Sequence, residues 1–191
     1  MDTTNFSSTN FGAKFINKIP VKKLDLLNNT YKDANVSFVQ IEPNNRNDAL
    51  ALKYTARYWY NGHYADNIAY TARQIYTGAI DSNRYQVYAL TKQKKHFNEL
   101  SSDKILGLVE VENKPNFTEI RHLQVDPELV YTIQPPTYKH VGTGILNSLK
   151  KFYKKSIELK SVYSAVKFYE KNGFKMSDPS KLRLRWEPSK K

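Results

Sequence analysis

Short segments in which apolar and polar residues alternate recur along the chain, and this period of two predicts β-strands. The clearest strand covers residues 105–112, and residues 117–125 follow it across a short turn, which predicts an antiparallel hairpin. A polar loop at residues 92–103 precedes the hairpin, and a long loop at residues 126–138 follows it. Further strands are expected at residues 36–41, 85–90, 157–160 and 182–186.

A second pattern, in which apolar residues recur every three or four positions, predicts α-helices. Its strongest instance covers about residues 143–155, where one helix face carries Ile145, Leu146, Leu149, Phe152 and Tyr153. Other helices are expected at about residues 48–60, 65–77 and 164–172. Residues 44–48 supply capping side chains for the first of these helices, and Asn172-Gly173 is a typical left-handed stop for the last.

The N-terminal part of the chain shows neither pattern clearly. Residues 1–12 are rich in Ser, Thr and Asn and are expected to be disordered, and the same composition fits a bacterial type III secretion signal. Within the next residues, the segment 21–27 is compatible with either a short helix or a strand. The sequence therefore predicts a partly disordered N-terminal extension at residues 1–34 before a single domain at residues 35–188.

Composition narrows the class of protein. Apolar residues make up 40% of the 191 residues, which is ample for a core, and no run of 18 apolar residues predicts a membrane span. The absence of cysteine excludes disulfides, thiolate metal sites and a cysteine nucleophile. The net charge of +12 favours polyanionic partners such as phosphorylated ligands, RNA or an acidic protein, although excess lysine is also common on solvated surfaces.

One glycine-containing turn stands out at residues 139–144, Lys-His-Val-Gly-Thr-Gly, where the strongest predicted helix begins. Backbone N–H groups at a helix start lack partners and lie at the positive end of the helix dipole, so they suit a phosphate or pyrophosphate. Glycine would let such a ligand approach more closely than a Cβ allows. The turn matches neither a Rossmann fingerprint nor a Walker loop, and a plain loop ending is the alternative interpretation.

Two further sequence blocks flank this turn. Residues 123–127, Leu-Gln-Val-Asp-Pro, precede it, and residues 168–174, Phe-Tyr-Glu-Lys-Asn-Gly-Phe, follow it. In this order the three blocks resemble those of the GNAT superfamily of acetyl-coenzyme A-dependent N-acetyltransferases. Two residues depart from the family pattern, because Lys139 stands where Arg or Gln is usual and Val162 where many members have Asn. About seven or eight extra residues also precede the turn.

The resemblance implies an α+β fold in which a central mixed, largely antiparallel sheet is flanked by helices on both faces. It also implies acetyl-coenzyme A as co-substrate, with the pyrophosphate on the turn and the pantetheine arm beside the strand that ends at Val125, where this strand splays from its neighbour. The residues expected to contact this cofactor are Leu123, Val125, Lys139, His140, Val141, Gly142, Thr143, Gly144 and Tyr169. No metal site is expected.

Acetyl transfer to an amine needs an acid for the departing thiolate and a base for the amine proton. The resemblance places Tyr169 near the sulfur, where its phenol would act as the acid. Glu119 matches the position at which some histone-acetylating members carry their base, and Glu110, Glu112 and His122 are the alternatives. An N–H group of the splayed strand would also bind the thioester carbonyl, as in an oxyanion hole.

The acceptor is expected to bind near the first two helices, where the family often has its acceptor wall. These helices carry Tyr54, Tyr58, Trp59, Tyr60, Tyr64, Tyr70 and Tyr76. The alternative interpretation is that the aromatic rings only close one side of the core. The loop at residues 126–138, with Tyr131, Gln134 and Tyr138, is expected to project over the site.

These features favour a macromolecular acceptor, namely a protein lysine or N-terminal amine. Toxin-like acetylation of aminoacyl-tRNA is one alternative, and a non-catalytic acyl-coenzyme A-binding regulatory module is the other. A cytoplasmic bacterial protein is expected, or a secreted effector that acts in a host cell.

Overall fold

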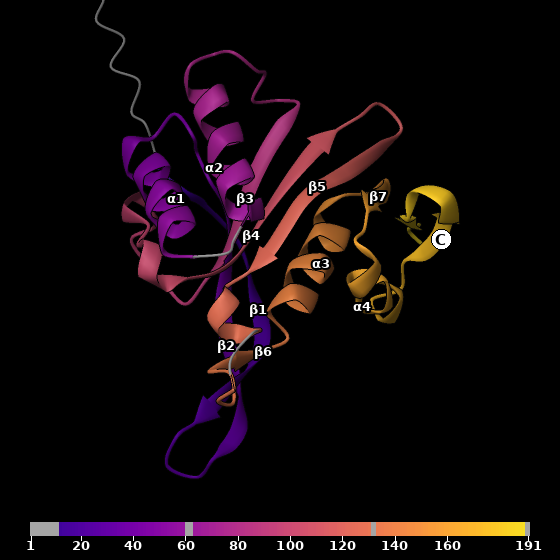
Figure 1. Cartoon of the computed structure of the whole chain (residues 1–191). Helices are drawn as coiled ribbons and strands as arrows, with labels where there is room; N and C mark the ends of the chain where they lie inside the picture. Colours follow the sequence, from indigo (N-terminus) through magenta and orange to yellow (C-terminus); the bar gives the residue numbers. More distant parts are fainter. Residues whose placement is uncertain (1–11, 60–62, 131–132, 190–191) are drawn as a thin grey trace, which may run out of the picture.

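The structure of the protein is a computed structural model that describes residues 12–59, 63–130 and 133–189. Within these residues one sheet has the strand order β6-β1-β2-β3-β4-β5-β7-β9-β8, and four α-helices pack against it (Figure 1). The strands are β1 (Lys14–Asp25), β2 (Thr30–Gln40), β3 (Tyr85–Thr91), β4 (Ile105–Asn113), β5 (Phe117–Val125), β6 (Tyr138–Lys139), β7 (Ser156–Lys160), β8 (Lys175–Asp178) and β9 (Arg183–Trp186). The helices are α1 (Arg46–Tyr58), α2 (His63–Tyr76), α3 (Val141–Phe152) and α4 (Val166–Lys171).

Among the strand pairs described, only β5 and β7 run parallel, and the others are antiparallel. The sheet separates two hydrophobic cores, because successive side chains of a strand point to opposite faces. On β4, Val109 and Val111 belong to the core shared with α3 and α4, whereas Leu108 belongs to the core shared with α1 and α2. Helices therefore cover both faces of a mixed, largely antiparallel sheet, and the expected α+β fold class is confirmed.

The structure confirms the expected capping residues at two helix ends. The side chain of Asn45 caps α1 by accepting hydrogen bonds from the backbone N–H groups of Asn47 and Asp48. After α4, Gly173 takes the left-handed conformation with φ of 78°. The helix expected at residues 143–155 begins two residues earlier and ends at Phe152, where the backbone of Tyr153 turns extended. No helix of the described residues is long and apolar enough to cross a membrane.

The N-terminal part differs from the expectation. Residues 14–25, which include the ambiguous segment 21–27, form the long strand β1, and β1 pairs with β2 in an antiparallel hairpin within the sheet. The boundary expected between residues 34 and 35 consequently falls inside β2. Ile19 and Val21 of β1 are buried in the core with α3, so this hairpin belongs to the folded domain. The disorder expected at residues 1–12 lies, except for Gly12, outside the described residues.

The exposure of the aromatic side chains on α1 and α2 contradicts one of the two interpretations of these helices. Trp59 is buried, but the tyrosines of α1 and α2 are exposed, which contradicts the idea that all these rings close the core. Tyr60 lies outside the described residues. β8 was not predicted, because the short segment 175–178 has too few residues to show alternation.

Candidate functional site

The site is organised by the two halves of β5. The first half is paired on both sides, since Phe117 to Ile120 form parallel pairs with β7 from Ser156 to Leu159. The second half, from His122 to Val125, pairs with β4 alone among the described strands. Its other edge therefore offers backbone N–H and C=O groups that no strand occupies. The splay expected at the strand ending at Val125 is thus present.

The glycine-containing turn joins β6 to α3. His140 precedes the helix in the left-handed conformation, with φ of 69°, and the first helical hydrogen bond runs from the N–H of Gly144 to the carbonyl of His140, at 2.8 Å. The N–H groups of residues 141–143 come before this bond and have no partner in the helix. The first turn also holds no acidic residue, so its positive end is uncompensated.

The reason for the two glycines of the turn is not the one expected. A Cβ on Gly142 would lie 3.0 Å from the ring of Phe168 and 3.5 Å from Val125, and a Cβ on Gly144 would lie 2.6 Å from Ile19. Neighbouring side chains of α4, β5 and β1 thus occupy the space that was expected to be kept for a ligand. The glycines allow α3 to pack closely, and the turn contributes its N–H groups rather than an open space above the glycines.

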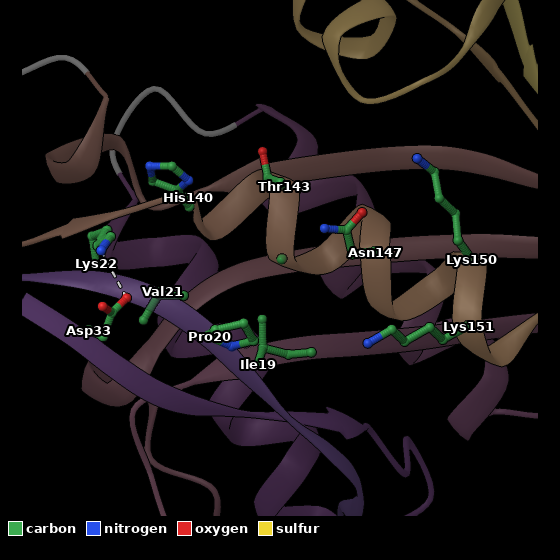
Figure 2. A pocket seen from close by; sticks show the side chains of 11 residues that line it. Ile19, Pro20, Val21, Lys22, Asp33, His140, Thr143, Asn147, Lys150 and Lys151 are labelled. Carbon is green, nitrogen blue, oxygen red and sulfur yellow. Dashed lines mark ion pairs between the residues drawn. The ribbon is translucent and has the colours of Figure 1, made fainter.

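A cavity of about 470 Å³ lies between β1 and α3 (Figure 2). Thr143 and Asn147 line it from α3, so it begins at the first turn of the helix. Lys151 reaches from α3 toward Ile19 in β1, whereas Lys150 points away and donates a hydrogen bond to the carbonyl of Asn172. The cavity therefore begins at the positive end of α3, and the cationic side chain of Lys151, from the last turn of the same helix, extends across it.

Lys139, one of the residues expected to contact the cofactor, is held by neighbouring residues at the edge of the sheet. Its ammonium nitrogen lies 3.8 Å from the centre of the Tyr31 ring, and Lys139 sits directly opposite Lys22 across β6 and β1. Lys22 in turn forms an ion pair of 2.9 Å with Asp33. A cation–π contact thus positions Lys139, the residue that stands where Arg or Gln was expected from the resemblance.

Tyr169 lies on α4, half-buried between two other aromatic rings. The ring centres of Phe168 and Phe174 are 5.1 Å and 5.9 Å away. Burial, with a smaller contribution from the neighbouring Tyr64, raises the pKa of Tyr169 to about 12. The phenol therefore keeps its proton at any physiological pH, as a proton donor requires.

His122 and Glu110 form a hydrogen-bonded pair on the face of the sheet covered by α2. A β-bulge at Arg121 shifts the register between β4 and β5, so that His122 lies opposite Glu110. The distance from His122 Nδ1 to Glu110 Oε2 is 2.9 Å, and the Glu110 side chain is only 1% exposed. Because an ionised carboxylate only accepts, it fixes the proton on Nδ1 and leaves Nε2 as the acceptor.

Residues of α2 surround this pair. The Tyr64 ring centre lies 5.6 Å from that of His122, and the amide nitrogen of Asn67 lies 3.4 Å from His122 Nε2. Gln124 of β5 accepts a hydrogen bond from the N–H of Ala65, which fixes the start of α2 against the open half of the strand. Tyr64 thus contacts His122 directly and acts electrostatically on the phenol of Tyr169.

The residue expected to be the base, Glu119, lies elsewhere on β5. It is in the half that pairs with β7, where its carboxylate contacts Lys114 at 2.6 Å and Arg183 at 3.7 Å. Glu112 is also paired with cations. Burial raises its pKa, but hydrogen bonds from Arg84 and Arg121 outweigh burial and lower the pKa below the ordinary value. Glu119 and Glu112 are paired with cations alone, whereas Glu110 pairs with Arg121 at 3.5 Å and also orients a histidine.

The remaining predicted cofactor residues surround the open half of β5. Leu123 and Val125 pack against the core shared with α3, and Val141 is buried, so these three can offer only backbone groups. Thr143 lines the cavity. Tyr64 and Asn67 were not predictable as neighbours of His122, because only the folded sheet brings α2 to β5. The bulge at Arg121 left no recognisable signal in the sequence.

Comparison with known proteins identifies the fold. No protein-family model and no curated protein matches the sequence. A Desulfovibrio desulfuricans structure assigned to the GNAT family of acetyltransferases matches 81% of this chain and 99% of its own, with 12% identity and a TM-score of 0.50.

Two other solved structures are similar. The PaiA N-acetyltransferase of Thermoplasma acidophilum, in complex with coenzyme A, shares 18% identity over 80% of this chain and 98% of its own, with a TM-score of 0.47. The ribosomal-protein-S18-alanine N-acetyltransferase of Escherichia coli shares 12% identity over 82% and 96%, with a TM-score of 0.49. The similarity to the Desulfovibrio structure, together with the strand order, the open half of β5 and the turn before α3, shows that the chain has the fold of the GNAT acetyltransferases.

Proposed function

We propose that this protein transfers an acetyl group from acetyl-coenzyme A to an amine of a macromolecule. The observation that carries the proposal is the meeting of three features at the open half of β5. These are the unpartnered N–H groups at the start of α3, the proton donor Tyr169, and the His122–Glu110 pair. Each supplies one requirement of the reaction, namely an anion site, an acid and a base.

The residues present fit acetyl-coenzyme A, whose thioester supplies the acetyl group. The N–H groups of residues 141–143 suit its pyrophosphate, and the free edge of β5 suits the amide groups of its pantetheine arm. The cavity beside Thr143 and Asn147 continues from the same turn. With Lys151 across it, the cavity suits the phosphorylated nucleoside end of the cofactor.

His122 is the base that the geometry favours, in place of Glu119. Its Nε2 is the acceptor, with the Asn67 amide nitrogen 3.4 Å away, and Glu110 holds the other ring nitrogen, so the imidazolium formed on taking the amine proton stays paired with a carboxylate. Tyr169 then donates its proton to the departing thiolate. Tyr64 contacts His122 and contributes to the raised pKa of Tyr169, which supports action of the two residues on one acceptor amine.

The candidate acceptors are a protein amine and an aminoacyl group on tRNA. The loop at residues 126–138, whose sequence favoured a protein amine, lies partly outside the described residues. The returning end of this loop lies along the sheet edge, since β6 pairs with β1 and the Tyr31 hydroxyl donates to the Pro136 carbonyl at 2.8 Å. The loop therefore gives less support to a protein acceptor than the sequence indicated.

The test is release of free thiol from acetyl-coenzyme A in the presence of a lysine peptide, a peptide with a free N-terminal amine, or an aminoacylated tRNA. We expect amine-dependent thiol release by the wild type and a loss of about 10²-fold or more in His122→Ala. His96→Asn is the matched control, because His96 is an exposed loop histidine with φ of 57°, a conformation that Asn tolerates. Tight binding of acetyl-coenzyme A in calorimetry without transfer to any amine would instead identify a non-catalytic acyl-coenzyme A-binding module.

A further inference from the structure

The solvent-facing sides of α1 and α2 carry four well-exposed tyrosines, Tyr54, Tyr58, Tyr70 and Tyr76, with exposed fractions between 43% and 71%. We call these residues, together with Lys53, Arg57 and Arg73, the tyrosine face. A tyrosine ring in water leaves a large apolar area unburied, so several of them on neighbouring helices indicate a surface that another molecule covers. The two helices lie side by side over the same face of the sheet (Figure 1).

The charges of this face are mostly cationic, with Asp66, one turn before Tyr70 on α2, as an exposed carboxylate. Lys53 and Arg57 alternate with Tyr54 and Tyr58 on successive turns of α1, and Arg73 follows Tyr70 by one turn of α2. Among the described residues no carboxylate forms an ion pair with these three cations. The cations are thus available to a negatively charged partner.

The same helices turn their aliphatic residues inward. Leu52 of α1 and Ile68 and Ile75 of α2 are buried. Tyrosine and arginine also occur in interfaces between folded proteins, but there they accompany an apolar centre from which lysine is depleted. The tyrosine face instead alternates aromatic rings with cations, which is the pattern that binds single-stranded nucleic acid, since bases stack on the rings and phosphates contact the cations.

The face also connects to the proposed active site. Tyr64, at the start of α2, lies against His122, and Tyr70 and Arg73 follow farther along the same helix. We propose that the tyrosine face binds single-stranded RNA, and that the amine acetylated at His122 is attached to this RNA. The second half of this statement rests on the proposed function; the binding itself does not.

The test is binding of a fluorescently labelled 12-nucleotide oligouridylate, followed by anisotropy at several salt concentrations. We expect Tyr58→Ala and Tyr70→Ala each to weaken binding by about tenfold, because a stacked base contributes that much. Arg57→Gln should weaken binding and reduce the slope of the salt dependence by about one phosphate contact. Tyr163→Ala is the matched control, because Tyr163 is 85% exposed but lies outside α1 and α2. Thermal melting of each variant shows that it is folded.

Three outcomes would overturn the proposal: no binding of the RNA at low salt, binding that the folded tyrosine variants leave unchanged, or equally tight binding of polyglutamate. The last would indicate a general affinity for polyanions, of the kind that an acidic protein uses. Thiol release measured with a peptide amine in the same variants separates the two proposals. Lost RNA binding with intact transfer to the peptide is expected, whereas intact RNA binding without transfer to any amine would refute only the enzymatic function.

Discussion

The two halves of β5 have the same neighbour on one side, β4, but differ on the other. From Phe117 to Ile120 the strand is closed by β7, and its carboxylate, Glu119, is bound to Lys114 and Arg183. From His122 to Val125 the strand edge is open, and the carboxylate that faces this half, Glu110, is bound to a histidine as well as to Arg121. A carboxylate whose partners are all cations stabilises the sheet, whereas one that also orients an imidazole prepares a base.

The difference teaches that strand pairing decides which charged side chains only hold the sheet together and which can take part in the reaction. Where both edges are paired, no substrate can reach the backbone, and the charged side chains form a cross-strand network that ties β4, β5 and β9 together. Where one edge is free, a cofactor can add its own amide groups to the strand. The start of α3 lies beside this free edge, where Gly142 packs near Val125 and near Phe168, the residue before Tyr169, so the chemistry is expected at the open half only.

The largest effect is expected at the open half, for His122→Ala. Loss of the proton acceptor should lower kcat by about 10²–10⁴-fold while the dissociation constant for acetyl-coenzyme A stays the same. Steady-state kinetics and calorimetry on one protein preparation measure both quantities. If kcat stays within a factor of three, the base lies elsewhere and the contrast between the two halves fails.

Tyr169→Phe should come next, with a loss in kcat of about 10²-fold, because the ring still packs against Phe168 and Phe174 while the proton donor is gone. Since burial raises the pKa of Tyr169 to about 12, the wild-type phenol loses its proton only at a much higher pH than usual. The wild-type rate should therefore show no decline from this ionisation up to about pH 10. A variant with undiminished turnover would leave Tyr169 as a packing residue.

A smaller effect is expected for Glu110→Gln, about tenfold in kcat. The amide can still accept from Nδ1, but it carries no charge to stabilise the imidazolium. Glu110 acts as a positioning residue through His122, so kcat should fall while KM for acetyl-coenzyme A does not change, and Glu110→Asp should restore part of the rate. Equal losses in the Asp and Gln variants, together with a lower melting temperature, would indicate a purely structural role.

The smallest effect on rate is expected at the closed half. Glu119→Gln should change kcat by less than about twofold and lower stability by roughly 0.5–1 kcal/mol, since the change removes one partner from Lys114 and Arg183 at a partly exposed site. Kinetics and chemical denaturation measure the two effects separately. A loss of turnover comparable to that of His122→Ala would restore Glu119 as the base and reverse the comparison.

The elements that carry a strong local signal were predictable from the sequence. β4, β5 and α3 have clear periodicities, and the turn before α3 stands between two recognisable blocks. The candidate bases were all named, but their ranking was not predictable. It depends on the bulge at Arg121, a shift of one residue between two strands, and simple alternation cannot show which side chains then share a face.

β1 illustrates what the sequence could not show. Its residues alternate imperfectly, and Pro20 interrupts them, so the segment has little strand signal of its own. It is a strand because β2 pairs with it along eleven positions and α3 covers Ile19. The sequence also could not show that the tyrosines are exposed, because aromatic residues on an amphipathic helix usually belong to its buried, apolar face.

β1 and α3 meet at Ile19 and Gly144, which are roughly 125 residues apart in the chain. During synthesis the hairpin of β1 and β2 leaves the ribosome first, but the helix that covers Ile19 and Val21 emerges only after most of the chain has been made. Contacts between such distant positions slow folding, because a long loop must close before they are formed. A nascent chain that stops before α3 would leave these two residues uncovered and ready to associate with other chains or chaperones.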